Sequence, residues 1–344
     1  MSATPLYIRS AAQISLQSPL CDDWLISPRA VVGDYVRAVD PNFRDHLSGS
    51  SSRRMGLVLK RAVTVAQQVL SEAGLDRPEA IVVGTGLGCV ESTEKFLEAL
   101  CRTGETLLGP THFMQSTHNT IASAIAIHTS CHGYNITFSH KAVSFDLALH
   151  DAALWLLSEG RTDAFVGAFD EVTPTYHVLL RRMGFVGRDG QVACGEAAAG
   201  FLLSTESDRA LCRLLAQSVC RATGSGEVAE RLSEFLSAHH LTAADIDVVV
   251  SGINGYAPHD EAYDQLCRYV CPQVPVVAYK QLFGECYSAP ALGFYVACRL
   301  LQHDAIPHHL FSSAVSVAPI RPTHILYINH SQSTDYAFAL LQRI

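Results

Sequence analysis

The run Ala80-Ile81-Val82-Val83 ends in the glycine-rich sequence Gly84-Thr85-Gly86-Leu87-Gly88. A short β-branched run closed by alternating glycines predicts a buried strand followed by a tight turn. Upstream, apolar residues recur at helical spacing over 55–73 and stop at Gly74, and downstream residues 91–100 have a helical pattern. A helix, a strand, a turn and a second helix in this order indicate an α/β sheet.

The same order of elements returns in the second half of the chain. The corresponding segments are a helix at 229–238, a strand at 248–250, a polar glycine turn at 251–255, a strand at 274–278 and an apolar helix at 289–301. This repetition predicts an internal duplication. We place the halves at 1–205 and 206–344, and because no Pro- or Gly-rich linker separates them, we expect one compact body.

Composition excludes several classes of protein. Of 344 residues, 48% are hydrophobic and only 17% are charged, which excludes a disordered chain or a coiled coil. The net charge is −8 and no basic block occurs, so we expect no nucleic-acid partner. No signal peptide and no apolar run of membrane-spanning length is visible, and eleven cysteines without a CxxC pair suit a reducing compartment. We therefore expect a cytoplasmic protein without a membrane span, and the low charge favours an oligomer.

Three patterns could carry chemistry, and each has a simpler interpretation. The turn at 84–88 is not the G-x-G-x-x-G of a dinucleotide site, so a structural turn is favoured and no cofactor is predicted. A group of histidines with one cysteine does not have the spacing of a zinc site, so no metal is predicted; its members are His112, His118, His128, Cys131, His132 and His140. Ser144, Asp146 and His150 lack the strained turn of a hydrolase nucleophile, and Asp146 and His150 are expected to pair on one helix face.

The informative segment runs from Thr137 to Leu149 and reads TFSHKAVSFDLAL, followed at 160–168 by GRTDAFVGA. It resembles the nucleophile region of β-ketoacyl synthases, in which a strand leads into a buried helix whose first turn carries a reactive cysteine. The position of that cysteine falls on Ala142. A helix N-terminus favours a thiolate, but a methyl group cannot form an acyl-enzyme.

Other motifs extend the resemblance over nearly the whole chain. They are Arg53-Arg54-Met55, the segment 195–203, Lys280 with Gly284, and Tyr327-Ile328-Asn329. The first catalytic histidine of the family aligns with Asn254 and the second with Glu285, while His330-Ser331-Gln332-Ser333 replaces the glycine-rich gating loop. Because those histidines stabilise an oxyanion and assist decarboxylation, an amide and a carboxylate do not replace them, and Glu285 would repel an enolate.

A synthase-like chain without its catalytic residues resembles the chain-length factors, which pair with an active ketosynthase. Gln115-Ser116-Thr117-His118-Asn119-Thr120 and Gly284-Glu285-Cys286-Tyr287 most resemble the subunit from aryl polyene clusters. The resemblance implies a thiolase fold with five α/β/α/β/α layers and a pseudo-two-fold axis. It also implies a non-catalytic subunit, a heterodimer with a catalytic β-ketoacyl synthase, and an acyl carrier protein that bears the polyene chain.

The resemblance also suggests where this subunit would act. The dimer interface would include the strand Asn135–Ser139, made of Asn135, Ile136, Thr137, Phe138 and Ser139, and the far wall of the acyl tunnel would include Leu87, Cys89, Thr93 and Phe96.

Two alternatives stay open. One is a condensing enzyme or thioester hydrolase that uses Cys131, Cys286 or Ser139 as its nucleophile. The other is an interaction subunit that binds the acyl carrier protein without forming a tunnel.

Overall fold

A computed structural model describes residues 4–104, 108–222, 224–270, 272–312 and 321–344. Within these residues the strands form one ten-stranded sheet. The strands are β1 (Leu6–Ile14), β2 (Ala80–Gly84), β3 (Tyr134–Phe138), β4 (Asp163–Asp170), β5 (Ala197–Ser204), β6 (Cys212–Arg221), β7 (Val248–Ser251), β8 (Val276–Ala278), β9 (His324–Ser331) and β10 (Asp335–Gln342).

The order of the strands reveals the internal duplication. It is β3-β2-β4-β5-β1 in the first half and β6-β10-β9-β7-β8 in the second. Counted within each half, both halves therefore run third, second, fourth, fifth, first from the outer edge to the centre. In both, the second strand lies parallel to its two neighbours and the remaining pairs are antiparallel. A short antiparallel pairing of β1 with β6 joins the halves, and the predicted boundary at 205/206 falls in the connection between β5 and β6.

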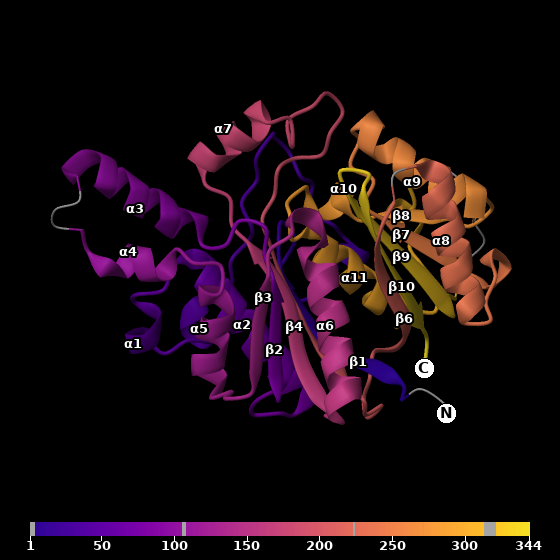
Figure 1. Cartoon of the computed structure of the whole chain (residues 1–344), viewed down its shortest axis with the longest axis horizontal. Coiled ribbons are helices and arrows are strands. Elements are labelled where there is room, and N and C mark those ends of the chain that lie inside the picture. The colour runs from indigo at the N-terminus through magenta and orange to yellow at the C-terminus, as the bar shows by residue number, and fades with distance from the viewer. Residues whose placement is uncertain (1–3, 105–107, 223, 271, 313–320) are drawn as a thin grey trace.

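The two halves of the sheet form two layers, and helices lie between them and on the outer face of each, which gives the five predicted layers (Figure 1). The described helices are α1 (Gly49–Ser52), α2 (Leu57–Ala73), α3 (Val90–Thr103), α4 (Pro110–Gln115), α5 (Thr120–Thr129), α6 (Ser144–Glu159), α7 (Pro174–Arg182), α8 (Ser225–Ala238), α9 (Ala257–Val270), α10 (Lys280–Phe283) and α11 (Ala289–Leu300). Helices α2 and α5 cover the outer face of the first half, and α8 and α9 cover that of the second. Helices α6 and α11 lie between the halves.

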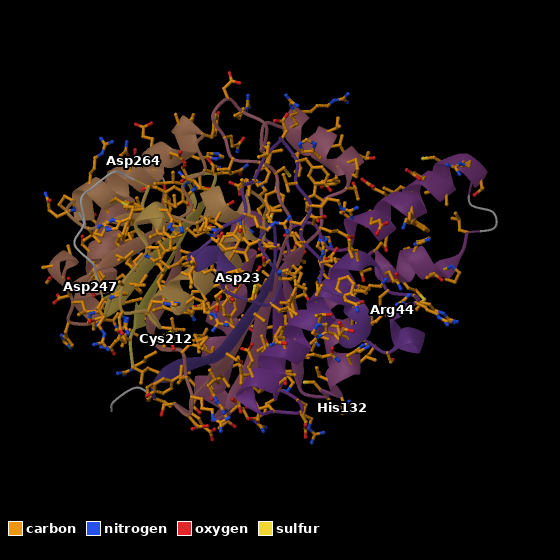
Figure 2. All side chains as sticks on the ribbon, turned by 180° about the vertical axis from the view of Figure 1, so that it is seen from behind. Asp23, Arg44, His132, Cys212, Asp247 and Asp264 are labelled. Carbon is orange, nitrogen blue, oxygen red and sulfur yellow. The ribbon has the colours of Figure 1, made fainter. Side chains whose placement is uncertain are left out.

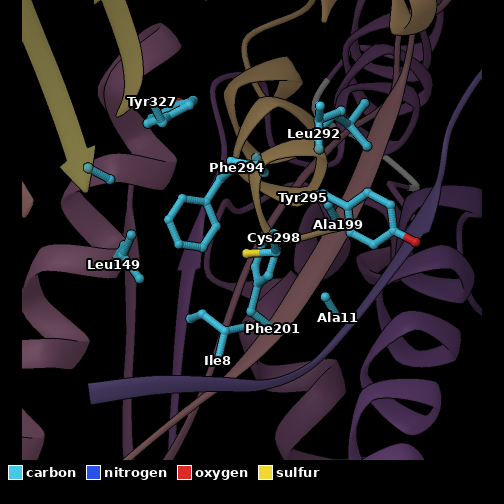
Figure 3. Close-up of a cluster of buried hydrophobic side chains, with 14 of the residues drawn as sticks. Ile8, Ala11, Leu149, Ala199, Phe201, Leu292, Phe294, Tyr295, Cys298 and Tyr327 are labelled. Carbon is cyan, nitrogen blue, oxygen red and sulfur yellow. The ribbon is translucent and has the colours of Figure 1, made fainter. Parts of the chain in front are cut away.

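The largest core lies around the two central helices. Phe145 of α6, Phe201 of β5 and Phe294 of α11 pack with ring centroids 5.1–5.5 Å apart, and all three are fully buried. Figure 3 shows Phe201 and Phe294 in this cluster. Tyr327 of β9 meets Phe294 from the second half. The two halves therefore share one apolar core, since aromatic side chains from both contact the same central helix.

The surface separates into a compact body and a projecting arm. In Figure 1, α3 and α4 extend away from the sheet, and Leu97, Phe113 and Met114 on this arm are at least half exposed. Seen from behind in Figure 2, Arg44 and His132 lie on the first half, and Asp247 and Asp264 lie on the second. None of the helices in the described part of the chain is long and apolar enough to cross a membrane.

One predicted element ends earlier than expected. Strand β3 ends at Phe138, so Ser139 does not belong to it. The reason is the length of its neighbour: β2 ends at Gly84, which pairs with Phe138, and the next amide, of Thr85, donates to the carbonyl of Phe138. Ser139 therefore has no ladder partner on β2, and it is exposed.

Candidate functional site

A pocket of about 130 Å³ brings together the three positions at which the family resemblance places catalytic residues. Ala142, Asn254 and Glu285 all line it, although they come from segments far apart in the sequence. Lys280, Tyr263 and His330 complete its inner wall, while Met183, Phe185 and Gln332 lie among its other lining residues. The spacing of motifs in the sequence therefore predicted residues that share one cavity.

Ala142 lies in a single 3-10 turn, Lys141–Val143, between β3 and α6. The turn is held at both ends: the Ser144 hydroxyl accepts from the amide of His140 at 2.8 Å, and Asn329 Nδ2 donates to the carbonyl of Ala142 at 2.8 Å. The buried Ala142 side chain is a methyl group, which offers the pocket neither a nucleophile nor a proton.

Asn254 and Glu285 contact each other and a buried cation. Asn254 Nδ2 donates to Glu285 Oε2 at 2.6 Å, and Lys280 Nζ lies 2.9 Å from the same oxygen. All three side chains are nearly fully buried. The amide donor of Asn254 is thus already engaged, and the charge of Glu285 is balanced by Lys280. Sequence reasoning used Lys280 as a motif residue and missed its role as the counter-ion of Glu285.

A second buried carboxylate lies behind the turn that carries Ala142. Asp146 of α6 accepts from Asn329 Nδ2 at 2.7 Å, and burial raises its pKa from 3.8 to about 7. The expected pairing of Asp146 with His150 is wrong, because Asn329 reaches Asp146 from β9 and the buried Nδ1 of His150 has no hydrogen-bond partner among the described residues. Asp146 therefore supports the turn and is not part of a hydrolase triad.

His330 closes the pocket from the β9–β10 hairpin. Its Nε2 lies 2.9 Å from the carbonyl of His259, and its Nδ1 accepts from the amide of Ser333 at 3.3 Å. Burial lowers its pKa from 6.5 to about 3, so the ring is neutral at pH 7 and Nε2 carries its proton. With both ring nitrogens engaged, His330 has no free donor for an oxyanion.

A carboxylate holds the glycine turn at 84–88. Asp170, at the end of β4, accepts from the Thr85 hydroxyl at 2.8 Å and from the amides of Gly86 and Leu87 at 3.1 and 2.8 Å. A Cβ at position 86 would lie 2.3 Å from the Cβ of Tyr287, so only glycine fits there. The turn amides that could bind a phosphate are thus occupied by the protein itself, in agreement with a structural turn.

Of the four predicted tunnel residues, Leu87 lies in this turn and Cys89, Thr93 and Phe96 follow it, and none of the four lines the pocket. Leu87 packs against a small buried cluster that contains Val172 and Leu180. Cys89 belongs to the buried cluster formed with α2 and α5, and burial raises the pKa of its thiol to about 12. The hydroxyl of Thr93 donates to the carbonyl of Cys89. The ring of Phe96 packs on that of Phe113 of α4, with the ring centroids 5.3 Å apart. Their place on a tunnel wall stays a prediction.

The predicted interface strand lies at an open edge. Strand β3 is the outermost strand of the first half, so one side of Asn135, Ile136, Thr137 and Phe138 has no partner strand within the described residues. Asn135 is exposed, and the others are half-buried. A role of this edge in dimer formation stays a prediction.

The alternative nucleophiles do not reach the pocket. Neither Cys131, Cys286 nor Ser139 is among the residues that line it. Cys286 is fully buried, and burial together with the nearby Asp170 raises the pKa of its thiol well above the ordinary value, which disfavours the thiolate. Within the described residues no group of three His, Cys, Asp or Glu side chains is placed to hold a metal ion.

Comparison with known families identifies the chain. Residues 37–248, more than half of its length, match the family model "Beta-ketoacyl synthase, N-terminal domain". The chain belongs to the β-ketoacyl synthase family. No curated protein sequence was found to match it.

Solved structures agree on the fold. A structure described as the ishigamide ketosynthase/chain length factor has a TM-score of 0.85 at 15% identity, and each chain is covered completely. The structure of the ketosynthase ApeO in complex with its chain length factor ApeC, from Xenorhabdus doucetiae, has a TM-score of 0.82 at 13% identity, with 99% of this chain and 98% of that chain covered. A type II polyketide synthase acyl-carrier protein in complex with its ketosynthase (AntDE:AntF) has a TM-score of 0.78 at 13% identity, with 99% and 100% covered. The predicted thiolase fold is therefore confirmed.

Proposed function

We propose that this chain is the non-catalytic chain-length-factor subunit of a ketosynthase heterodimer. It pairs with a catalytic β-ketoacyl synthase, stabilises that partner and shapes the tunnel that receives the growing acyl chain. The carrier of that chain is an acyl carrier protein, and the product class is an aryl polyene or a related polyketide. We place the complex of the two subunits in the cytoplasm.

The observation that carries the proposal is the pocket at Ala142. It brings together the three positions at which the family resemblance places catalytic residues, yet Ala142 supplies a methyl group, Asn254 donates to Glu285, and Lys280 neutralises Glu285. Condensation needs a nucleophile and free donors for an oxyanion. A pocket whose polar groups satisfy one another supports a subunit that leaves this chemistry to its partner.

The open edge of β3 supports the heterodimer. An unpaired edge with half-buried Ile136 and Phe138 is a site for pairing with another strand, and natural proteins rarely leave such an edge uncovered. Two of the solved structures with the same fold are described as a ketosynthase with a chain length factor, one of them naming ApeC. Those descriptions concern the other proteins and support the same division of labour here.

The test is covalent labelling of the complex. The chain is co-expressed with its ketosynthase, and the purified pair is incubated with an acyl-loaded carrier protein before intact-mass analysis. We expect an acyl adduct on the ketosynthase, which serves as the internal positive control, and an unchanged mass for this chain because Ala142 cannot be acylated. A stoichiometric adduct on this chain would reject the non-catalytic assignment and favour a nucleophile outside the pocket.

A further inference from the structure

Glu171, which directly follows β4, reaches the beginnings of two helices with one carboxylate. Its Oε2 accepts from the amide of Val58 at 3.2 Å, and its Oε1 accepts from the amide of Glu91 at 3.1 Å. Val58 and Glu91 are the second residues of α2 and α3. The side chain is almost fully buried. One acidic group therefore ties the helix that covers the first half to the helix that begins the arm.

Neither helix has a cap of its own. The residues before α2 and α3 are Gly56 and Cys89, and neither supplies a side-chain hydrogen bond to its helix. The first amides of a helix need acceptors, and a carboxylate there also interacts favourably with the helix dipole. Glu171 thus replaces two local caps by one group whose position is fixed by β4.

Beyond its first turn, α3 makes few contacts with the rest of the protein other than α4. Among the described side chains of α3 only Val90 and Ser92 are buried, and the helix packs mainly on α4, which projects with it (Figure 1). A second contact links α3 to the body: the hydroxyl of Thr173 donates to the Glu94 carboxylate at 2.5 Å. The described hydrogen bonds from α3 to the body therefore lie within its first five residues, and α4 has its own bond to the body, from Gln115 Nε2 to the carbonyl of Arg54 at 2.6 Å.

We propose that Glu171 is the positioning residue of the arm, and that the hydrogen bonds from its two oxygens place α3 and thereby set product length. This inference rests on the proposed tunnel role of Leu87, Cys89, Thr93 and Phe96. A tilt of about 10° at the base moves Phe96, about 9 Å along the helix from Val90, by about 1.5 Å. Such a movement changes the depth of a tunnel wall without touching the partner's reaction centre.

The experiment compares Glu171→Gln with the matched control Glu91→Gln in the complex with the ketosynthase at pH 8, where Glu171, whose pKa burial raises to about 7, is mostly ionised. Gln at 171 keeps the size of the side chain but offers one acceptor and one NH₂ group, so one of the two helix amides meets a donor. Glu91 has a partly exposed side chain that pairs with Lys95 at 2.7 Å, and its replacement leaves the amide of residue 91 in place. Hydrogen exchange at Val58 and Glu91 reports the caps, and mass spectrometry of the products reports chain length.

We expect amide exchange at Val58 or Glu91 to be about tenfold faster or more in Glu171→Gln and unchanged in Glu91→Gln. The products of Glu171→Gln shift or broaden by at least one two-carbon unit, while the elongation rate of the assembled complex is unchanged. Unchanged exchange overturns the inference. So does a parallel loss of rate and assembled complex at constant product length, which would indicate a merely structural residue.

Phe96→Ala separates this inference from the function on which it rests. If Phe96→Ala lengthens the product and Glu171→Gln does not change it, the positioning role fails and the tunnel role stands. If neither variant changes product length in an intact complex, the tunnel role itself fails, and the positioning role fails with it.

Discussion

Both halves of the chain place a glycine turn after their second strand, and in both an aspartate holds the turn amides, but the aspartates come from different places. In the first half Asp170 arrives from the neighbouring strand β4 and binds the amides of Gly86 and Leu87. In the second half Asp260 arrives from α9 and binds the amides of Asn254 and Gly255, each at 2.8 Å. In both halves an aspartate therefore binds the turn amides, but it comes from a strand in the first half and from a helix in the second.

The difference decides what each turn can do. Asp170 holds its turn through the Thr85 hydroxyl and the turn amides, and α3 begins directly after this turn. The first turn therefore supports the start of the arm. Asp260 accepts only from backbone amides of its turn, so the side chain of Asn254 is available to donate to Glu285 in the pocket. Duplication thus supplied two equivalent turns, and the side chains around them gave one a supporting role and the other a place in the pocket.

The largest effect is expected in the pocket of the second half. Glu285→Leu leaves Lys280 buried without a counter-charge and Asn254 Nδ2 without its acceptor, so we expect a loss of about 3–5 kcal/mol in the free energy of unfolding. Urea unfolding of the purified protein at a fixed concentration measures it. The double variant Lys280→Met/Glu285→Leu should recover most of the loss, because the buried pair is then replaced by apolar side chains. A loss below about 1 kcal/mol in the single variant would mean that the three side chains do not depend on one another.

The two aspartates themselves provide the next comparison. Asp170→Ala leaves two amides and the hydroxyls of Thr85 and Ser288 without an acceptor in a buried site, so we expect a loss of about 3 kcal/mol. Asp260→Ala should cost about 1 kcal/mol, because Asp260 is only half-buried and water can reach the exposed Gly255. Thermal and urea unfolding of both variants measure the difference. Equal losses would show that the two turns are supported equally and would remove the contrast between the halves.

The repeated turn shows what the sequence could and could not predict. The β-branched runs at 80–83 and 248–250, each followed by glycines, predicted both turns and the duplication, because strand and turn preferences act over a few residues. Ala142, Asn254 and Glu285 could be predicted as a set because a known motif order places each of them, and the structure brings all three to one pocket.

The partners of these residues could not be predicted in the same way. Glu285 meets Asn254 across 31 positions, and Asp146 meets Asn329 across 183, so neither pair leaves a local pattern. Nothing in the local sequence shows that Asp170 holds the turn at 84–88 or that Glu171 binds the first turns of α2 and α3. Ser139 was included in the predicted interface strand, whereas the length of β2 ends that strand one residue earlier.

The remaining effect concerns pH and again contrasts the halves. Asp146, on α6 of the first half, has a folded pKa of about 7, above its ordinary 3.8, so the folded protein binds more protons than the unfolded chain between these values. Its contribution to the free energy of unfolding therefore falls as pH rises from 5 to 7. His330, in the second half, has a folded pKa of about 3, below its ordinary 6.5, and its contribution rises with pH over most of the same range.

We therefore expect Asp146→Asn and His330→Gln to change the pH dependence of stability in opposite directions. From pH 5 to pH 7, the free energy of unfolding of Asp146→Asn should rise by about 2 kcal/mol relative to the unmodified protein, because the falling contribution has been removed. For His330→Gln it should fall by about 2 kcal/mol over the same interval. Glu171, whose pKa is also raised to about 7 by burial, titrates in all three proteins and cancels in the comparison. Urea unfolding at pH 5, 6 and 7 provides the measurement, and curves that stay parallel for all three proteins would show that neither group changes its proton binding on folding.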